Sequence, residues 1–155
     1  MIIRKITKAD NQAVGNLVQV VLMEMGAPKV GTAYADPFLF DLFSVYNEPK
    51  SVYYIIENQN RIVGGAGIGP LENDVCELQK MYFLPETRGL GLGTKLMQIC
   101  LDDAKSFGYQ SCYLETMHYM TDAQKLYRKV GFENIDAPLG NTGHTSCPVW
   151  MLKKL

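Results

Sequence analysis

A glycine-rich segment between an apolar stretch and a helical run is the strongest chemical signal in the sequence. Glu77–Phe83 is apolar enough for a buried strand, Pro85 cannot continue a sheet ladder, and residues 89–93 carry three glycines that lead into the helical run Thr94–Phe107. A helix start carries about half a positive charge and several unpaired N–H donors, so glycines that expose the backbone there make an anion site. Phosphate is the usual anion at such a site, so the segment predicts a phosphate-bearing ligand.

Two other glycine motifs for nucleotides do not match. A dinucleotide fingerprint needs G-x-G-x-x-G, and the segment that begins at Gly89 lacks the third glycine at that spacing. A nucleoside-triphosphate loop needs G-x-x-x-x-G-K-[ST], and Gly64–Gly69 has the first spacing but is followed by Pro70 and Leu71. We therefore interpret Gly64, Gly65, Gly67 and Gly69 as part of a strand with bulges or with a closely packed helix.

The elements that must position the glycine-rich segment alternate between strands and helices. The pattern predicts strands at Ile2–Ile6, Ser51–Asn58, Arg61–Gly69, Glu77–Phe83, Cys112–Glu115, Phe132–Ile135 and Val149–Leu152. It predicts helices from Thr7 or Asp10 to Gly26, from about Pro37 to Tyr46, over Thr94–Phe107 and over Thr121–Lys129. Hairpins make antiparallel neighbours, and only the Thr94–Phe107 helix is expected to cross between parallel strands. The expected fold is α/β (α+β), a mixed sheet with helices on both faces.

Composition bounds the remaining possibilities. The 155 residues are 47% hydrophobic, which suits one domain over residues 1–155. Lysine plus arginine (15) nearly balance aspartate plus glutamate (16), so we expect neither nucleic acid nor a membrane as a partner. The N-terminus has no signal-peptide pattern, and the four widely spaced cysteines suit reduced core thiols, so we expect a cytoplasmic protein.

Three linked motifs resemble the GNAT family of N-acetyltransferases. Residues Arg88–Gly93, RGLGLG, match the family's R/Q-x-x-G-x-G/A loop. Upstream, ELQKMYFLPETRG resembles the family's fourth strand and its exit loop, and downstream, AQKLYRKVGF resembles its A-x-x-L-Y-x-x-x-G-F helix and following strand. The resemblance implies the GNAT acyl-CoA N-acyltransferase fold, a mostly antiparallel sheet whose parallel fourth and fifth strands splay apart.

The resemblance also implies acetyl-CoA as co-substrate. By that carry-over, the backbone of Met81–Phe83 holds the pantetheine and the acetyl carbonyl, and Arg88–Thr94 wraps the pyrophosphate. Met120 stands where many members carry an asparagine, which puts one side-chain hydrogen bond to pantetheine in question. The implied cofactor-binding residues are Met81, Tyr82, Phe83, Arg88, Gly89, Leu90, Gly91, Leu92, Gly93, Thr94 and Met120.

The implied reaction needs a proton acceptor and a proton donor. A lysine-like amine with a pKa of about 10.4 is mostly charged near neutral pH, a deficit of roughly 4 to 5 kcal/mol. Glu77 matches the family's strand base, and a carboxylate in a partly apolar cleft has a raised pKa. The alternative is a strand-edge glutamate that faces solvent or pairs with Lys80. Tyr127 matches the family tyrosine that protonates the leaving thiolate, and its alternative is a core aromatic residue.

The remaining expectations concern partners. The acceptor is a primary amine on a small molecule or a protein, attacking the thioester directly, and a homodimer through the C-terminal strands is expected by family analogy alone. His144 and Cys147 lack a second ligand pair, so we expect no metal, and His118 is interpreted as a surface residue. The alternative function is an acyl-CoA-binding or regulatory module without turnover, which Met120 suggests.

Overall fold

The computed structural model describes all 155 residues and contains one seven-stranded sheet in the order β1-β2-β3-β4-β5-β7-β6. The strands are β1 (Ile2–Lys5), β2 (Val52–Asn58), β3 (Arg61–Glu72), β4 (Val75–Phe83), β5 (Ser111–Thr116), β6 (Glu133–Ile135) and β7 (Val149–Lys154). The helices are α1 (Asn11–Glu24), α2 (Leu42–Tyr46), α3 (Leu92–Ser106) and α4 (Thr121–Val130), with single 3-10 turns at Lys8–Asp10, Ala33–Ala35 and Pro85–Thr87.

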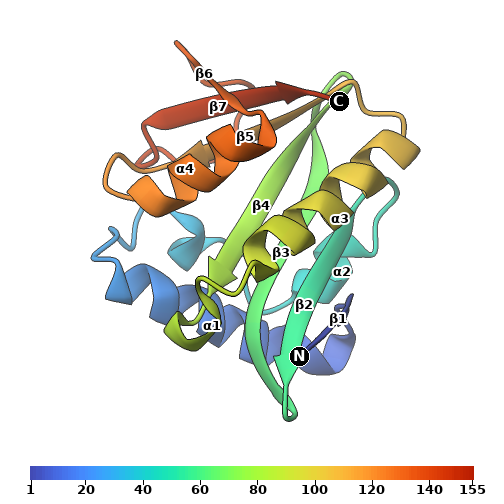
Figure 1. Cartoon of the computed structure of the whole chain (residues 1–155), viewed down its shortest axis with the longest axis vertical. Helices are drawn as coiled ribbons and strands as arrows, with labels where there is room; N and C mark the ends of the chain where they lie inside the picture. Colours follow the sequence, from blue (N-terminus) through green and yellow to red (C-terminus); the bar gives the residue numbers. More distant parts are fainter.

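The predicted fold class is confirmed. Every neighbouring pair of strands is antiparallel except β4 and β5, which are parallel and are connected through α3. Figure 1 shows α3 and α4 over one face of the sheet and α1 and α2 over the other. None of the helices combines the length and the apolar composition that a membrane-spanning segment needs. All four cysteines are free, and only Cys147 is not fully buried.

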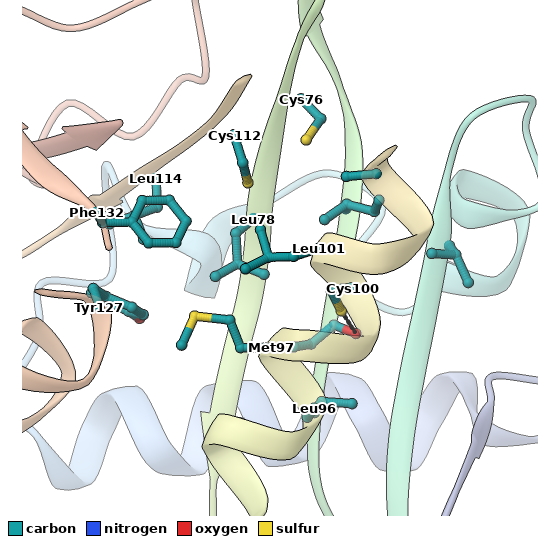
Figure 2. Close-up of a cluster of buried hydrophobic side chains, with 14 of the residues drawn as sticks. Cys76, Leu78, Leu96, Met97, Cys100, Leu101, Cys112, Leu114, Tyr127 and Phe132 are labelled. Atoms are coloured by element: carbon teal, nitrogen blue, oxygen red, sulfur yellow. Dashed lines mark hydrogen bonds between the residues drawn. The ribbon is translucent and has the colours of Figure 1, made fainter. Parts of the chain in front are cut away.

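Two hydrophobic clusters hold these layers together. The larger, of 22 buried residues, packs α3 and the Tyr127 side of α4 against the central strands. Figure 2 shows Leu101 of α3 next to Leu78 of β4, and Met97 extending from α3 toward Tyr127. The smaller, of 10 buried residues, joins α1 to α2 and β2. Apolar residues on one face of each helix produce this two-sided core.

The second helix is shorter than predicted. Residues 37–40 form turns rather than the start of a helix, and α2 begins only at Leu42. The physical reason is a cap supplied from α1: the side chain of Asn11 donates to Asp41 Oδ1 and accepts from the Phe43 backbone N–H at 2.8 Å. Phe38, which lies in these turns, is 65% exposed.

Candidate active site

The parallel strands β4 and β5 pair over only three residues. The register runs from Val75 opposite Ser111 to Glu77 opposite Tyr113 and then stops, although β4 continues to Phe83. Past Glu77 the two strands therefore diverge, as the expected splay requires. A cavity of about 540 Å³ lies at this divergence and is lined by both strands, the glycine-rich loop, α4 and residues 144 and 147 of the loop before β7.

A bulge in β4 shapes the wall of this cavity. Gly65 pairs with Tyr82 and Gly67 with Gln79, so Lys80 and Met81 together stand opposite Ala66. Lys80 adopts a positive φ of 49°, which is uncommon for a residue with a side chain. The bulge redirects the strand from Lys80 onward and leaves Met81–Phe83 along the cavity.

The glycines of β3 make room for the side chain that holds the bulge. Tyr53 of β2 donates a hydrogen bond from its hydroxyl to the Lys80 carbonyl at 2.8 Å. A Cβ atom added to Gly65 would lie 2.7 Å from the Tyr53 hydroxyl, and one added to Gly67 would lie 2.5 Å from the Tyr53 ring. A side chain at either glycine would displace Tyr53, so these are positions of close packing next to a bulge, although the packing partner is a strand residue and not a helix.

The glycine-rich loop opens the backbone at the start of α3. Gly89 and Gly91 have φ values of 76° and 74°, and no atom lies near the place a Cβ would occupy at either. The helix starts at Leu92 rather than at the predicted Thr94, with Gly91 as its N-cap. The first-turn N–H groups have no partner within the helix, so this end of the cavity is suited to an anion.

Arg88 forms an ion pair with a glutamate and is not an unpaired cation. Its guanidinium makes two hydrogen bonds of 2.8 Å to the Glu24 carboxylate at the end of α1 and also donates to the Phe83 carbonyl. The pair lowers the pKa of Glu24 through the hydrogen bonds from Arg88. Because Glu24 offsets the charge of Arg88, the positive potential at this end of the cavity comes mainly from the backbone amides of the loop and α3.

Glu77 lies at the floor of the cavity, where the strands begin to separate. Its side chain is 5% exposed, and burial raises its pKa. One hydrogen bond acts in the opposite direction, since Gln79 Nε2 donates to Glu77 Oε2 at 2.7 Å. The alternative interpretation of Glu77 is wrong: the residue does not face solvent, and Lys80 pairs with Asp36 instead.

Tyr127 and Met120 line the same cavity from α4. Tyr127 is 8% exposed, its ring meets Phe132 edge-on at 6.1 Å, and burial raises its pKa to about 12. The phenol is therefore protonated across the physiological range. Met120 is the N-cap of α4 and lies 3.5 Å from the Thr116 hydroxyl through its sulfur, so this position offers a thioether to the cavity.

Glu115, which the sequence did not single out, and His144, considered there only as a metal ligand, complete the floor of the cavity. Atoms of Glu77, Glu115 and His144 lie within 4.8 Å of one another, and Tyr113 and Thr142 each donate a hydrogen bond to Glu115. None of the three family motifs contains Glu115. Its position on the predicted strand Cys112–Glu115, which was expected to separate from the Glu77 strand, is the one signal that could have pointed to it. His118, in contrast, is exposed and does not line the cavity.

Two long loops close this end of the cavity. His144 Nε2 lies 2.9 Å from Asp36 Oδ1, and the Ser146 N–H donates to the Gly31 carbonyl at 3.0 Å. Burial lowers the pKa of His144, but the hydrogen bond and charge of Asp36 outweigh it and the net shift is upward. Asp36 thus joins Lys80 on β4 to His144 on the loop before β7.

Comparison with known proteins agrees with this geometry. The family model of the acetyltransferase (GNAT) family matches residues 22–132. The uncharacterized N-acetyltransferase YjgM of Escherichia coli is 44% identical over 158 aligned residues, covering 99% of this chain and 95% of that protein.

Two solved structures share the fold. A GNAT acetyltransferase from Staphylococcus aureus Mu50 superposes with a TM-score of 0.90 at 22% identity over 99% of this chain and 98% of the other. The protein yncA of Salmonella typhimurium, solved with its cofactor acetyl-CoA, gives a TM-score of 0.79 at 18% identity, covering 100% of this chain and 94% of that chain. The family match, the relative and the splayed strands together show that the chain is an N-acetyltransferase of the GNAT family.

Proposed function

We propose that the protein transfers the acetyl group of acetyl-CoA to a primary amine by direct attack of the amine on the thioester. The observation that carries this proposal is one continuous cavity that joins the open start of α3 to the buried Glu77 and Tyr127. An anion site at one end and a proton acceptor at the other are what an acyl-CoA and an ammonium acceptor need.

The cavity residues fit a coenzyme A thioester. The amides of Gly89–Thr94 suit a diphosphate, because they combine unpaired donors with the positive end of the α3 dipole. Met81–Phe83 follow the bulge along the unpaired edge of β4, where an amide such as that of Met81 or Tyr82 can stabilise a developing oxyanion. Acetyl-CoA supplies the activated acyl group, and one solved relative of the same fold contains it.

Glu77 is proposed as the general base. Its buried carboxylate has a raised pKa, which brings it closer to the pKa of the ammonium it must deprotonate, directly or through water. No covalent intermediate with the protein is required, because orientation of the neutral amine next to the thioester is sufficient for attack. The mechanism uses no metal, so EDTA should leave the rate unchanged.

Tyr127 is proposed as the general acid. A buried phenol with a pKa of about 12 keeps its proton at neutral pH and can donate it to the departing thiolate. The thiolate is already a fair leaving group, so this donation accelerates the reaction without being indispensable.

The test is an acceptor screen. The protein is incubated with acetyl-CoA and a panel of small amines, amino acids and peptides, with free thiol measured and the acetylated product detected by mass. We expect Glu77→Gln and Tyr127→Phe to be slower than Tyr109→Phe, a control whose hydroxyl bonds the Lys50 carbonyl away from the cavity. Wild-type rates in both variants would remove the assigned roles.

The binding module without turnover makes a different prediction. Met120 offers a thioether where many relatives carry an amide, and it lines the cavity. Thermal stabilisation by acetyl-CoA without thiol release on any acceptor would favour that function over catalysis. Introducing Met120→Asn would then be expected to change acetyl-CoA affinity alone.

A further inference from the structure

A chain of two hydrogen bonds runs from α2 to the carboxylate of Glu77. The Tyr46 hydroxyl lies 2.7 Å from Gln79 Oε1, and Gln79 Nε2 lies 2.7 Å from Glu77 Oε2. Glu77 and Gln79 are two residues apart on β4 and therefore point to the same face of the sheet. Tyr46 is the last residue of α2 and is 5% exposed.

The direction of each hydrogen bond follows from chemistry. An ionised carboxylate only accepts, so Gln79 must turn its NH₂ group toward Glu77. Its carbonyl oxygen then faces Tyr46, which must donate. Burial raises the pKa of Tyr46 well above its usual value, so the phenol keeps the proton that it donates. Tyr46 thereby fixes which end of the Gln79 amide meets the carboxylate.

The same aromatic residues also support the neighbouring bulge. The rings of Tyr46 and Tyr53 have centroids 5.0 Å apart, and the Tyr53 hydroxyl holds the Lys80 carbonyl. The proposed base and the β4 backbone after the bulge are therefore supported by one buried pair of tyrosines.

We propose that Gln79 and Tyr46 are positioning residues that hold the Glu77 carboxylate in one orientation at the cavity floor and favour its anionic form. The inference rests on the proposed function only for its catalytic consequence. Burial alone would favour the protonated carboxyl, which cannot act as a base, and a donated hydrogen bond to the anion opposes that tendency. The remaining oxygen of Glu77 is then available to the acceptor or to a water molecule.

Other charged groups also act on Glu77 and must be held constant. Glu115 on β5 favours the protonated form of Glu77, whereas His144 on the closing loop and Lys80 on β4 favour the anion. Asp36 pairs with both Lys80 and His144, and the Tyr113 hydroxyl is bound to Glu115. None of these groups is substituted in the variants of Gln79 or Tyr46. A shift of the Glu77 titration midpoint in those variants therefore measures the effect of the hydrogen-bond chain.

The test measures the Glu77 titration directly and then its effect on catalysis. In protein with ¹³C-labelled glutamate, the Glu77 carboxyl signal, assigned with Glu77→Gln, is titrated in wild type, Gln79→Met, Tyr46→Phe and the double variant. Methionine keeps the length of glutamine without its amide. We expect the midpoint to rise by about one pH unit in Gln79→Met, as loss of a hydrogen bond to a charged group implies. A smaller rise is expected in Tyr46→Phe.

The double variant and the controls separate positioning from general damage. Because Tyr46 acts through Gln79, the double variant should match Gln79→Met alone. Tyr109→Phe and the surface change Gln98→Met should leave the midpoint at its wild-type value. The ascending limb of the kcat/KM profile should shift by the same amount as the carboxyl signal, while the rate on the plateau changes little.

Two results would overturn the proposal: an unchanged Glu77 midpoint in Gln79→Met, or additive shifts in the double variant. If Tyr46→Phe does not fold, Gln79→Met still decides the question. A shifted carboxyl signal with an unmoved kcat/KM limb would support the hydrogen-bond chain and reject Glu77 as the base. The inference and the proposed function therefore fail in distinguishable ways.

Discussion

The guanidinium of Arg88 forms two hydrogen bonds of 2.8 Å with the carboxylate of Glu24, which lies 64 residues earlier at the end of α1. This contact ties the glycine-rich loop to a helix on the opposite face of the sheet. It also means that the cation next to the proposed diphosphate site is already paired. Partly exposed ion pairs stabilise folds by about 1 kcal/mol at most, so the pair is more important for the site than for the fold.

The first prediction concerns this pair. Glu24→Gln should free Arg88 for the diphosphate and lower the KM for acetyl-CoA severalfold at low salt, with a small change in melting temperature. Arg88→Met should raise that KM. If Glu24→Gln left the KM unchanged, Arg88 would act only through the Phe83 carbonyl that it binds.

The second prediction concerns proton donation by Tyr127. Tyr127→Phe should lower kcat about tenfold to a hundredfold and leave the KM for acetyl-CoA nearly unchanged, because the ring still fills its place beside Phe132. With a pKa of about 12, the wild-type phenol should cause no fall in rate up to pH 10. If the wild-type rate fell below pH 10 and this fall were absent in Tyr127→Phe, the pKa of about 12 for Tyr127 would be contradicted. Steady-state kinetics between pH 6 and 10 provide the measurement.

The third prediction links the proposed base to stability. Burial raises the pKa of Glu77, so the folded state binds its proton more tightly than the unfolded state does. The stabilising contribution of the Glu77 carboxyl to the free energy of unfolding is therefore fully present below the pKa that Glu77 has in the unfolded chain. It is lost as the pH rises through the pKa that Glu77 has in the folded protein. Glu77→Gln should raise the melting temperature at pH 7 while it lowers turnover, and the gain should vanish near pH 4. Equal melting curves at both pH values would contradict this linkage.

The fourth prediction tests the support of the bulge. Gly65→Ala should lower the free energy of unfolding by about 1–3 kcal/mol, because the added methyl group lies 2.7 Å from the Tyr53 hydroxyl. Tyr53→Phe removes only the hydrogen bond to Lys80 and should cost about 1 kcal/mol. Urea denaturation of both variants gives these values. A neutral Gly65→Ala would show that Tyr53 can move without disturbing β4.

Local sequence patterns predicted much of the fold. The sequence was sufficient to predict the order of strands and helices, the single parallel pair and the glycines before α3. Apolar periodicity and glycine positions determine local structure within a few residues, so they can be read without the tertiary fold. The helix predicted from about Pro37 shows where this local logic ends. Its true start at Leu42 depends on a side chain of α1, and no pattern within residues 37–46 contains that information.

The sequence by itself was sufficient to identify the family, and it placed Glu77 and Tyr127 in family motifs. Both residues line the same cavity in the structure. Only the tertiary structure decided what surrounds them. Tyr46 lies 33 residues before Gln79, Glu24 lies 64 before Arg88, and Asp36 lies 108 before His144. Such partners are chosen by how the sheet, helices and loops pack, so their identity appears only once the chain is folded. The proton affinity of Glu77 is set in part the same way, by burial, by its neighbour Gln79 on the same strand and by His144 and Glu115, which are distant in sequence.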